Sequence, residues 1–214
     1  MSTLSVLHGL LNNAGNIIVN KKTRKIKVDD LTISPLTPAL WPDFENLFGP
    51  RGAYGGCWCM WWRVTRKEFE SCQGEKNRRS FRKIVDSGKV TGLLGYINNQ
   101  AVGWCSVAPR EQFSSLERSH VLKRIDDKAV WSIVCFYIKK DHRGDGLTLK
   151  MIRGAIEYVR QRGGEIIEAY PTAVRSPNAP PVSIFMGIPE VYKQAGFREV
   201  ARPSRSKRIM RLSV

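Results

Sequence analysis

The stretch that most limits the fold of this chain runs from an apolar segment, through a charged turn, into an amphipathic pattern. Residues 129–138 (AVWSIVCFYI) are apolar at both alternating sets of positions, as in a strand covered on both faces of a sheet. From Leu147 onwards, apolar residues recur at helical spacing until Gly163 and Gly164 end the pattern. A second strand-like segment, 165–170 (EIIEAY), follows. Strand, helix and strand at this spacing predict a right-handed parallel crossover.

The turn between this strand and helix, Arg143-Gly144-Asp145-Gly146, has the composition of an anion-binding site. The first N–H groups of a helix lack partners within it, and neighbouring glycines let a phosphate come close. The spacing of a P-loop is absent, and a dinucleotide fingerprint fails because Leu149 stands where its third glycine is needed. From spacing alone, a phosphate site and a simple tight turn both remain open.

The other segments predict a mixed sheet with short helices, in the α/β (α+β) class. Alternating or apolar patterns predict a strand at 31–33, a hairpin that turns at Asn98-Asn99-Gln100, and strands at 197–202 and 208–214. Helical spacing predicts helices at 37–47, 76–86 and 189–195. The segment 114–126 is predicted to be a short helix or an ordered loop. We expect one domain over residues 29–214. Residues 1–28 are expected to be an N-terminal extension with a basic linker, 21–27.

Charge and cysteine content limit the environment and the partners. The net charge is +16 and the isoelectric point is about 10.0, which favours polyanionic partners, although a solvated basic surface explains the same numbers. No stretch of about 18 uninterrupted apolar residues occurs, so no membrane span is expected. The first 16 residues lack the basic start of a secretory signal. Five cysteines, two of them inside strand-like runs, indicate free thiols in a reducing, cytoplasmic setting.

Four segments in order resemble the GNAT superfamily of N-acetyltransferases, in particular an uncharacterised bacterial-type subgroup. They are GAYGGCWCMWWR, VGWCSVAPRE, VWSIVCFYIKKDHRGDGL and YKQAGFREVAR, and the resemblance covers roughly residues 29–214. The acyl-CoA motif of that superfamily, [Q/R]-x-x-G-x-[G/A], is matched by Arg143 and Gly146, whereas Thr148 stands where Gly or Ala is usual. The resemblance implies a mixed, mostly antiparallel sheet with a splayed parallel central pair flanked by helices.

The resemblance also implies acetyl-CoA as co-substrate, without a metal. Its pantetheine is expected to pair with the backbone of Phe136, Tyr137 and Ile138. Its pyrophosphate is expected on the amides of Arg143, Gly144, Asp145, Gly146, Leu147 and Thr148.

Two catalytic residues are expected from the same resemblance. Tyr192 in YKQAGF stands where the family places the acid that protonates the leaving CoA thiolate, and a phenol is protonated at neutral pH. Glu168 in EIIEAY is the candidate general base for the amine, although a surface glutamate in an ordinary ion pair remains an equal interpretation. His120 and His142 titrate in a suitable range but have weaker positional support.

The cysteines suggest neither a metal site nor a covalent intermediate. Cys57 and Cys59 have no second ligand pair, and Cys135 lies in a buried run, so a core thiol is favoured over a nucleophile. The aromatic residues beside Cys57 and Cys59 predict either an acceptor pocket or a hydrophobic mini-core.

The favoured hypothesis is transfer of an acetyl group to an amine acceptor by direct attack in a ternary complex. The acceptor is a small molecule or a protein amine, and the charge favours an acidic or phosphorylated one. The alternatives are a basic nucleic-acid or ribosome-binding protein and a CoA-binding sensor without transfer activity. No membrane partner is expected, nucleic acid is not favoured, and a homodimer stays open.

Overall fold

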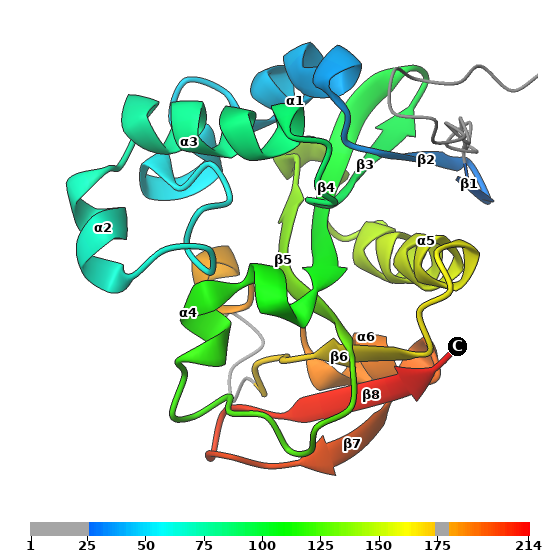
Figure 1. The fold of residues 1–214 in the computed structure, drawn as a ribbon. Helices are drawn as coiled ribbons and strands as arrows, with labels where there is room; N and C mark the ends of the chain where they lie inside the picture. Colours follow the sequence, from blue (N-terminus) through cyan, green and yellow to red (C-terminus); the bar gives the residue numbers. More distant parts are fainter. Residues whose placement is uncertain (1–25, 174–179) are drawn as a thin grey trace, which may run out of the picture.

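A computed structural model shows one sheet with helices on both faces, and it describes residues 26–173 and 180–214 (Figure 1). The strands are β1 (Ile26–Val28), β2 (Leu31–Pro35), β3 (Leu93–Ile97), β4 (Gln100–Pro109), β5 (Trp131–Ile138), β6 (Ile166–Ala169), β7 (Arg198–Ala201) and β8 (Ile209–Ser213). Over the described residues, their order in the sheet is β1-β2-β3-β4-β5-β6-β8-β7.

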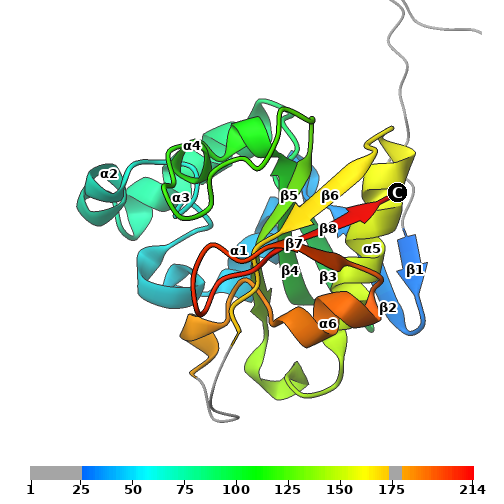
Figure 2. The same cartoon turned by 90° about the horizontal axis from the view of Figure 1, so that it is seen from below.

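The helices lie in two layers. They are α1 (Trp41–Phe48), α2 (Arg66–Ser71), α3 (Glu75–Asp86), α4 (Ser114–Glu117), α5 (Leu147–Gln161) and α6 (Pro189–Gln194), with 3-10 or π-type turns η1 (Pro38–Leu40), η2 (Gly52–Gly56), η3 (Arg110–Gln112), η4 (Lys140–His142) and η5 (Pro181–Ser183). Helix α5 covers one face of the sheet and contacts α6, while α1 contacts β4 from the other face, on the side of α2, α3 and α4 (Figure 2).

The sheet is antiparallel except for one central pair. Among the described strands, only β5 and β6 run parallel, and they pair from Trp131↔Ile167 to Ile133↔Ala169. Beyond Ile133, β5 continues along β4 alone. The crossover through α5 and the splay of the parallel pair, which we expected, are therefore confirmed.

A bulge in the β4–β5 pairing lies where the two parallel strands separate. Cys135 faces Ser106, but the next pair is Ile133 with Val107, so Val134 is an additional residue in β5. A bulge of this kind bends a strand and changes the face to which its side chains point. Its position helps to turn β5 away from β6.

Three buried clusters hold the layers together. The α5 face includes Leu31, Met151 and Ile152, which are fully buried against the sheet. The opposite face contains an aromatic cluster in which the rings of Phe44 and Trp104 meet edge to face, 4.9 Å between centroids. Such pairs add about 0.5–1.5 kcal/mol to the stabilisation from burial alone. A third cluster lies under α4 and includes Leu116, Val134 and Tyr170, beside the splay.

Most of the predicted elements are present, and one helix was missed. Asn98 and Asn99 both have positive φ in the β3–β4 hairpin, as predicted. Helix α2 was not predicted, although Thr65 and Glu68 form a complete capping box at its start. The sheet also begins at Ile26, inside the segment that we predicted as linker, because Lys27 and Val28 extend the pairing with β2.

Residues 1–25 of the predicted N-terminal extension lie outside the described residues, as do residues 174–179, between the predicted strand 165–170 and the predicted helix 189–195. In the part of the chain that the structure describes, no helix has the length and apolar character needed to cross a bilayer.

Candidate active site

The turn before α5 has the geometry of an anion-binding site. Gly144 has φ +95° and Gly146 has φ +72° in the left-handed region, and both are exposed. No atom lies within 4 Å of the Cβ position of either glycine. Gly146 is the N-cap of α5 and has no side chain to cap the helix, and the Leu149 amide already donates to the Gly146 carbonyl at 3.0 Å. Among the described residues, the amides of Leu147 and Thr148 therefore have no side-chain cap. A pyrophosphate can therefore approach these amides closely, favoured by the positive end of the helix dipole.

The other residues of the turn leave this approach open. Arg143 is exposed, and its Nε donates to the carbonyl of Ile138 at 3.0 Å, so it ties the turn to the end of β5. Asp145 is exposed, and Thr148 is half-buried in the first turn of α5.

The free edge of β5 is occupied by the chain itself. The N–H of Phe136 donates to the carbonyl of Phe185 at 2.7 Å, at the point where β6 has diverged. We call residues 184–187 the strap. Thr172 N–H donates to the Gly187 carbonyl (3.0 Å), and the Lys207 ammonium lies 3.6 Å from Met186 Sδ. The strap thus lies in the splay, where the pantetheine backbone contacts were predicted.

Tyr192 lies beneath the strap. Its side chain is fully buried, and its hydroxyl donates to the Met186 carbonyl at 3.0 Å. Its ring lies 6.4 Å from that of Phe136 and 5.1 Å from that of Phe197. Burial raises the pKa of the Tyr192 phenol well above its ordinary value, so this group is a proton donor and not a base at neutral pH.

Glu168 lies in a buried polar network on the opposite face of the sheet. Its Oε1 accepts from Arg110 Nη1 (2.8 Å) and from the Tyr170 hydroxyl (2.6 Å), and its Oε2 accepts from Arg211 Nε (2.7 Å). Arg110 and Tyr170 have no exposed surface, and Glu168 is 1% exposed. Both carboxylate oxygens are therefore engaged by the protein. The alternative of an ion-paired surface glutamate is right about the pairing and wrong about the surface, because the partners Arg110 and Arg211 hold Glu168 inside the protein.

Arg110 is the centre of this network and was missed in the sequence. Its guanidinium also binds Glu117 through Nε and donates to the Leu122 carbonyl through Nη2 (2.7 Å). A fully buried arginine is rare without such complete pairing. Nothing in its sequence context, an arginine after Pro109 at the end of β4, distinguishes it from a surface charge.

The predicted site residues thus form three groups. The turn of 143–148 and the end of β5 are adjacent through the Arg143 hydrogen bond. Phe136 and Tyr192 lie together in the core on the α5 face. Glu168 belongs to the network on the other face. Its role as a general base, and that of Tyr192 as an acid, stay predictions.

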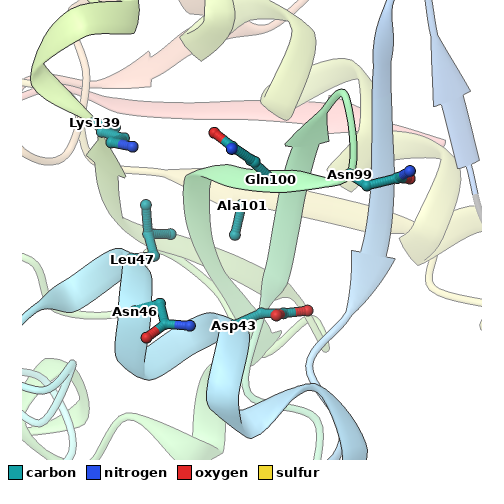
Figure 3. A pocket seen from close by; sticks show the side chains of 7 residues that line it. All are labelled: Asp43, Asn46, Leu47, Asn99, Gln100, Ala101 and Lys139. Carbon is teal, nitrogen blue, oxygen red and sulfur yellow. The ribbon is translucent and has the colours of Figure 1, made fainter.

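A separate polar pocket of about 340 Å³ opens between α1 and the β3–β4 hairpin (Figure 3). It is lined by Asp43, Asn46, Leu47, Asn99, Gln100, Ala101 and Lys139. Asp43 accepts a hydrogen bond from the Tyr96 hydroxyl at 3.0 Å. Lys139 follows β5 and precedes the anion turn, but none of the predicted site residues lines this pocket.

The described residues contain no group of three or more His, Cys, Asp or Glu side chains arranged to hold a metal ion.

Comparison with known proteins identifies a family. The sequence model described as "Acetyltransferase (GNAT) family" matches residues 58–185, which is more than half of the chain. No curated protein matches the sequence significantly.

Solved structures share the fold at low sequence identity. Ribosomal-protein-S5-alanine acetyltransferase from Vibrio fischeri is 11% identical with a TM-score of 0.52, and the match covers 89% of this chain and 96% of that one. A GNAT-family acetyltransferase from Listeria monocytogenes is 12% identical, with TM-score 0.52 and coverages of 89% and 100%. An uncharacterised protein from Bacillus halodurans is 14% identical, with TM-score 0.52 and coverages of 90% and 92%.

Proposed function

Because the chain belongs to the acetyltransferase (GNAT) family, we propose that it transfers an acetyl group from acetyl-CoA to an amine acceptor by direct attack in a ternary complex. The observation that carries this proposal is the anion turn. Gly144 and Gly146 open the uncapped N-terminus of α5 to solvent, directly after a central strand that has separated from its parallel neighbour. A pyrophosphate on the turn would direct the attached pantetheine along this strand.

The turn residues would hold the pyrophosphate through backbone amides and not through basic side chains. The amides of Leu147 and Thr148 lie in the first turn of α5, and residues 144–146 directly precede it. Charge-assisted hydrogen bonds from helix N-terminal amides to phosphate oxygens are strong. Arg143 keeps the turn attached to β5 through the Ile138 carbonyl. Thr148 is half-buried, whereas Gly144 and Gly146 are exposed, so the solvent-facing side of the turn is formed by the two glycines.

Binding of pantetheine requires a change in the strap. The Phe136 N–H, which we expect to pair with pantetheine, now donates to the Phe185 carbonyl. Exchange of one carbonyl acceptor for another costs little hydrogen-bond energy, because the donor is satisfied before and after. We therefore expect acetyl-CoA to displace the strap from β5 without unfolding the sheet.

The same displacement would expose Tyr192. Its hydroxyl donates to the Met186 carbonyl, which belongs to the strap. When the strap moves, the phenol loses that acceptor and can donate instead to the sulfur of the leaving CoA thiolate. Its raised pKa keeps the proton available at neutral pH.

Glu168 fits a supporting role better than direct contact with the amine. Its two oxygens fix Arg110, Arg211 and Tyr170 at the end of β6. That network sets the position of β6 on one side of the splay. A general base for the acceptor amine would need one of these oxygens to be released.

An acidic or phosphorylated acceptor fits the charge of +16. A nucleic-acid-binding protein and a CoA sensor without transfer activity are the alternatives. The observation that favours them is that the strap occupies the gap between β5 and β6, where pantetheine would bind. Retention on RNA or DNA that falls steeply with salt, without any effect of acetyl-CoA, would favour the first. Binding of CoA without product formation for any amine would favour the second.

Ligand-dependent melting combined with hydrogen exchange tests the proposal. Saturating acetyl-CoA is expected to raise the melting temperature, because it binds only the folded state. In the same sample, exchange should increase in the strap and decrease in residues 144–148. Unchanged melting in millimolar acetyl-CoA and CoA would refute the proposal.

A further inference from the structure

Lys207 is a half-buried lysine beside the gap between β5 and β6. It forms an isolated antiparallel bridge with Thr172, and the Ala173 N–H donates to the Ser206 carbonyl at 2.7 Å. These contacts continue the pairing of β6 with β8 beyond the end of β6, after β6 has separated from β5. The backbone of Lys207 is therefore fixed next to the space that the strap fills.

The ammonium of Lys207 faces the strap and has no counter-charge. Its Nζ donates to Thr172 Oγ1 at 2.8 Å and lies 3.6 Å from Met186 Sδ. Within residues 26–173 and 180–214, no carboxylate forms an ion pair with Lys207, whereas the next residue, Arg208, pairs with Glu199 at 3.4 Å. Burial lowers the pKa of the Lys207 amine below its ordinary value. The neutral amine, which is the nucleophilic form, is therefore easier to reach than in an exposed lysine.

Met186 of the strap separates Lys207 from Tyr192. Its carbonyl accepts from the Tyr192 hydroxyl at 3.0 Å, and its sulfur contacts the Lys207 ammonium. The Met186 side chain is fully buried in the cluster under α4, whereas Tyr192 belongs to the cluster on the α5 face. The phenol and the amine thus reach the strap from opposite faces of the sheet.

This arrangement is the one that acetyl transfer to an amine requires. The amine must reach the carbonyl carbon of the thioester while an acid reaches its sulfur. Under the proposed function, acetyl-CoA displaces the strap and Tyr192 donates to the CoA sulfur. The Lys207 amine would then face the same thioester from the other side. Because its backbone is already in place, transfer to it needs no encounter with a diffusing acceptor.

On the basis of the proposed function, we propose that the protein transfers an acetyl group from acetyl-CoA to the Nζ of its own Lys207. The neutral amine attacks the thioester carbonyl carbon, an N–C bond forms, and the C–S bond breaks with its electron pair going to sulfur. Tyr192 gives its proton to the sulfur, and the proton lost from nitrogen returns to Tyr192 through water. The products are N-acetyllysine and CoA, and acetyl-CoA is the only other reactant.

Mass spectrometry of the full-length protein tests the proposal in the absence of any added amine. The protein is incubated with acetyl-CoA that carries a deuterated acetyl group, and the modified peptides are followed over time. Lys193, which is exposed and adjacent to Tyr192 in the chain, reports the uncatalysed reaction. Lys207 should be acetylated at least about tenfold faster than Lys193, with a rate constant independent of protein concentration, since the reaction is intramolecular. Equal rates at the two lysines, or a rate constant that rises with protein concentration, would overturn the proposal.

Substitutions separate catalysis from simple reactivity. Tyr192→Phe should slow acetylation of Lys207 and leave that of Lys193 unchanged, because only Lys207 uses the acid. Lys207→Arg should remove the modification at that position, and the control Lys193→Arg should acetylate Lys207 as the wild type does. If a variant fails to fold, the comparison of Lys207 with Lys193 in the wild type still decides. Unchanged acetylation of Lys207 in folded Tyr192→Phe would contradict transfer within this site.

The melting temperature in acetyl-CoA and acetylation of free amines, measured on the same protein, distinguish this inference from the proposed function. A raised melting temperature and acetylated free amines, with Lys207 unmodified, would overturn the self-acetylation alone and leave the proposed function in place. Unchanged melting without any acetylation would refute both.

Discussion

Two glycines at opposite ends of α5 allow the anion site to be tested with a matched control. Gly146 precedes the helix and Gly163 follows it. Both have φ +72°, and neither has an atom within 4 Å of its Cβ position. Substitution by Ala therefore introduces the same backbone strain and no clash at either end. Only the Cβ at Gly146 would stand where a pyrophosphate is expected.

The expected magnitudes follow from this geometry. Alanine in the left-handed region costs roughly 1–2 kcal/mol, and the loss of glycine freedom in the unfolded chain returns about 0.4–1 kcal/mol. Both Gly146→Ala and Gly163→Ala should thus lower the free energy of unfolding by at most about 1.6 kcal/mol. At Gly146, the loss of one charge-assisted amide–phosphate hydrogen bond, worth about 1.5–3 kcal/mol, should weaken acetyl-CoA binding about 10- to 100-fold.

Calorimetric titration with acetyl-CoA and urea denaturation measure the two effects separately. The wild type and Gly163→Ala should bind acetyl-CoA with equal affinity, whereas Gly146→Ala should bind more weakly. Equal affinity in all three proteins would refute the assignment of the pyrophosphate to this turn. Equal weakening in both variants would show that helix strain, and not the phosphate contact, controls binding.

Three further changes test other residues. Tyr192→Phe removes the hydroxyl bond to the Met186 carbonyl and should cost about 1 kcal/mol in a urea melt. It should also reduce kcat while acetyl-CoA affinity is kept; unchanged kcat would exclude the acid role. Glu168→Gln removes the charge from a fully buried pair with Arg110 and should destabilise by about 3–5 kcal/mol. Full stability with turnover abolished would instead favour a general base. Because the folded pKa of Cys59 is lowered, its stabilising contribution is present above the ordinary thiol pKa and is lost as pH falls through about 6. The stability difference between the wild type and Cys59→Ser should therefore grow from pH 6 to 9 in urea melts; a constant difference would contradict a Cys59 thiolate.

Local patterns in the sequence were sufficient for most of the fold. The apolar run of β5, the helical spacing of α5 and the Asn98-Asn99 turn each depend on neighbours within a few residues. Helix α2 was equally local, since Thr65 and Glu68 form its capping box, and it could have been predicted from that signal.

The site was harder to predict because its decisive contacts join distant residues. Arg110 meets Glu168, and Trp104 meets Cys59, only after the sheet has formed. The turn of 143–146 could be predicted as an anion site because its glycines and the helix start are adjacent in sequence. The strap could not be foreseen, since the bond from Phe136 to Phe185 depends on how the segment after β6 folds back into the splay.

The most direct test of acetyl transfer is the release of free CoA from acetyl-CoA in the presence of a panel of amines. The panel should contain neutral, acidic and phosphorylated small amines and peptides with free N-termini, and mass spectrometry should identify the product. We predict CoA release that depends on one amine class, with an acceptor that gains one acetyl group. Absence of acetylated product across the panel, in protein shown to bind acetyl-CoA, would contradict the proposed transferase and favour a CoA-binding sensor.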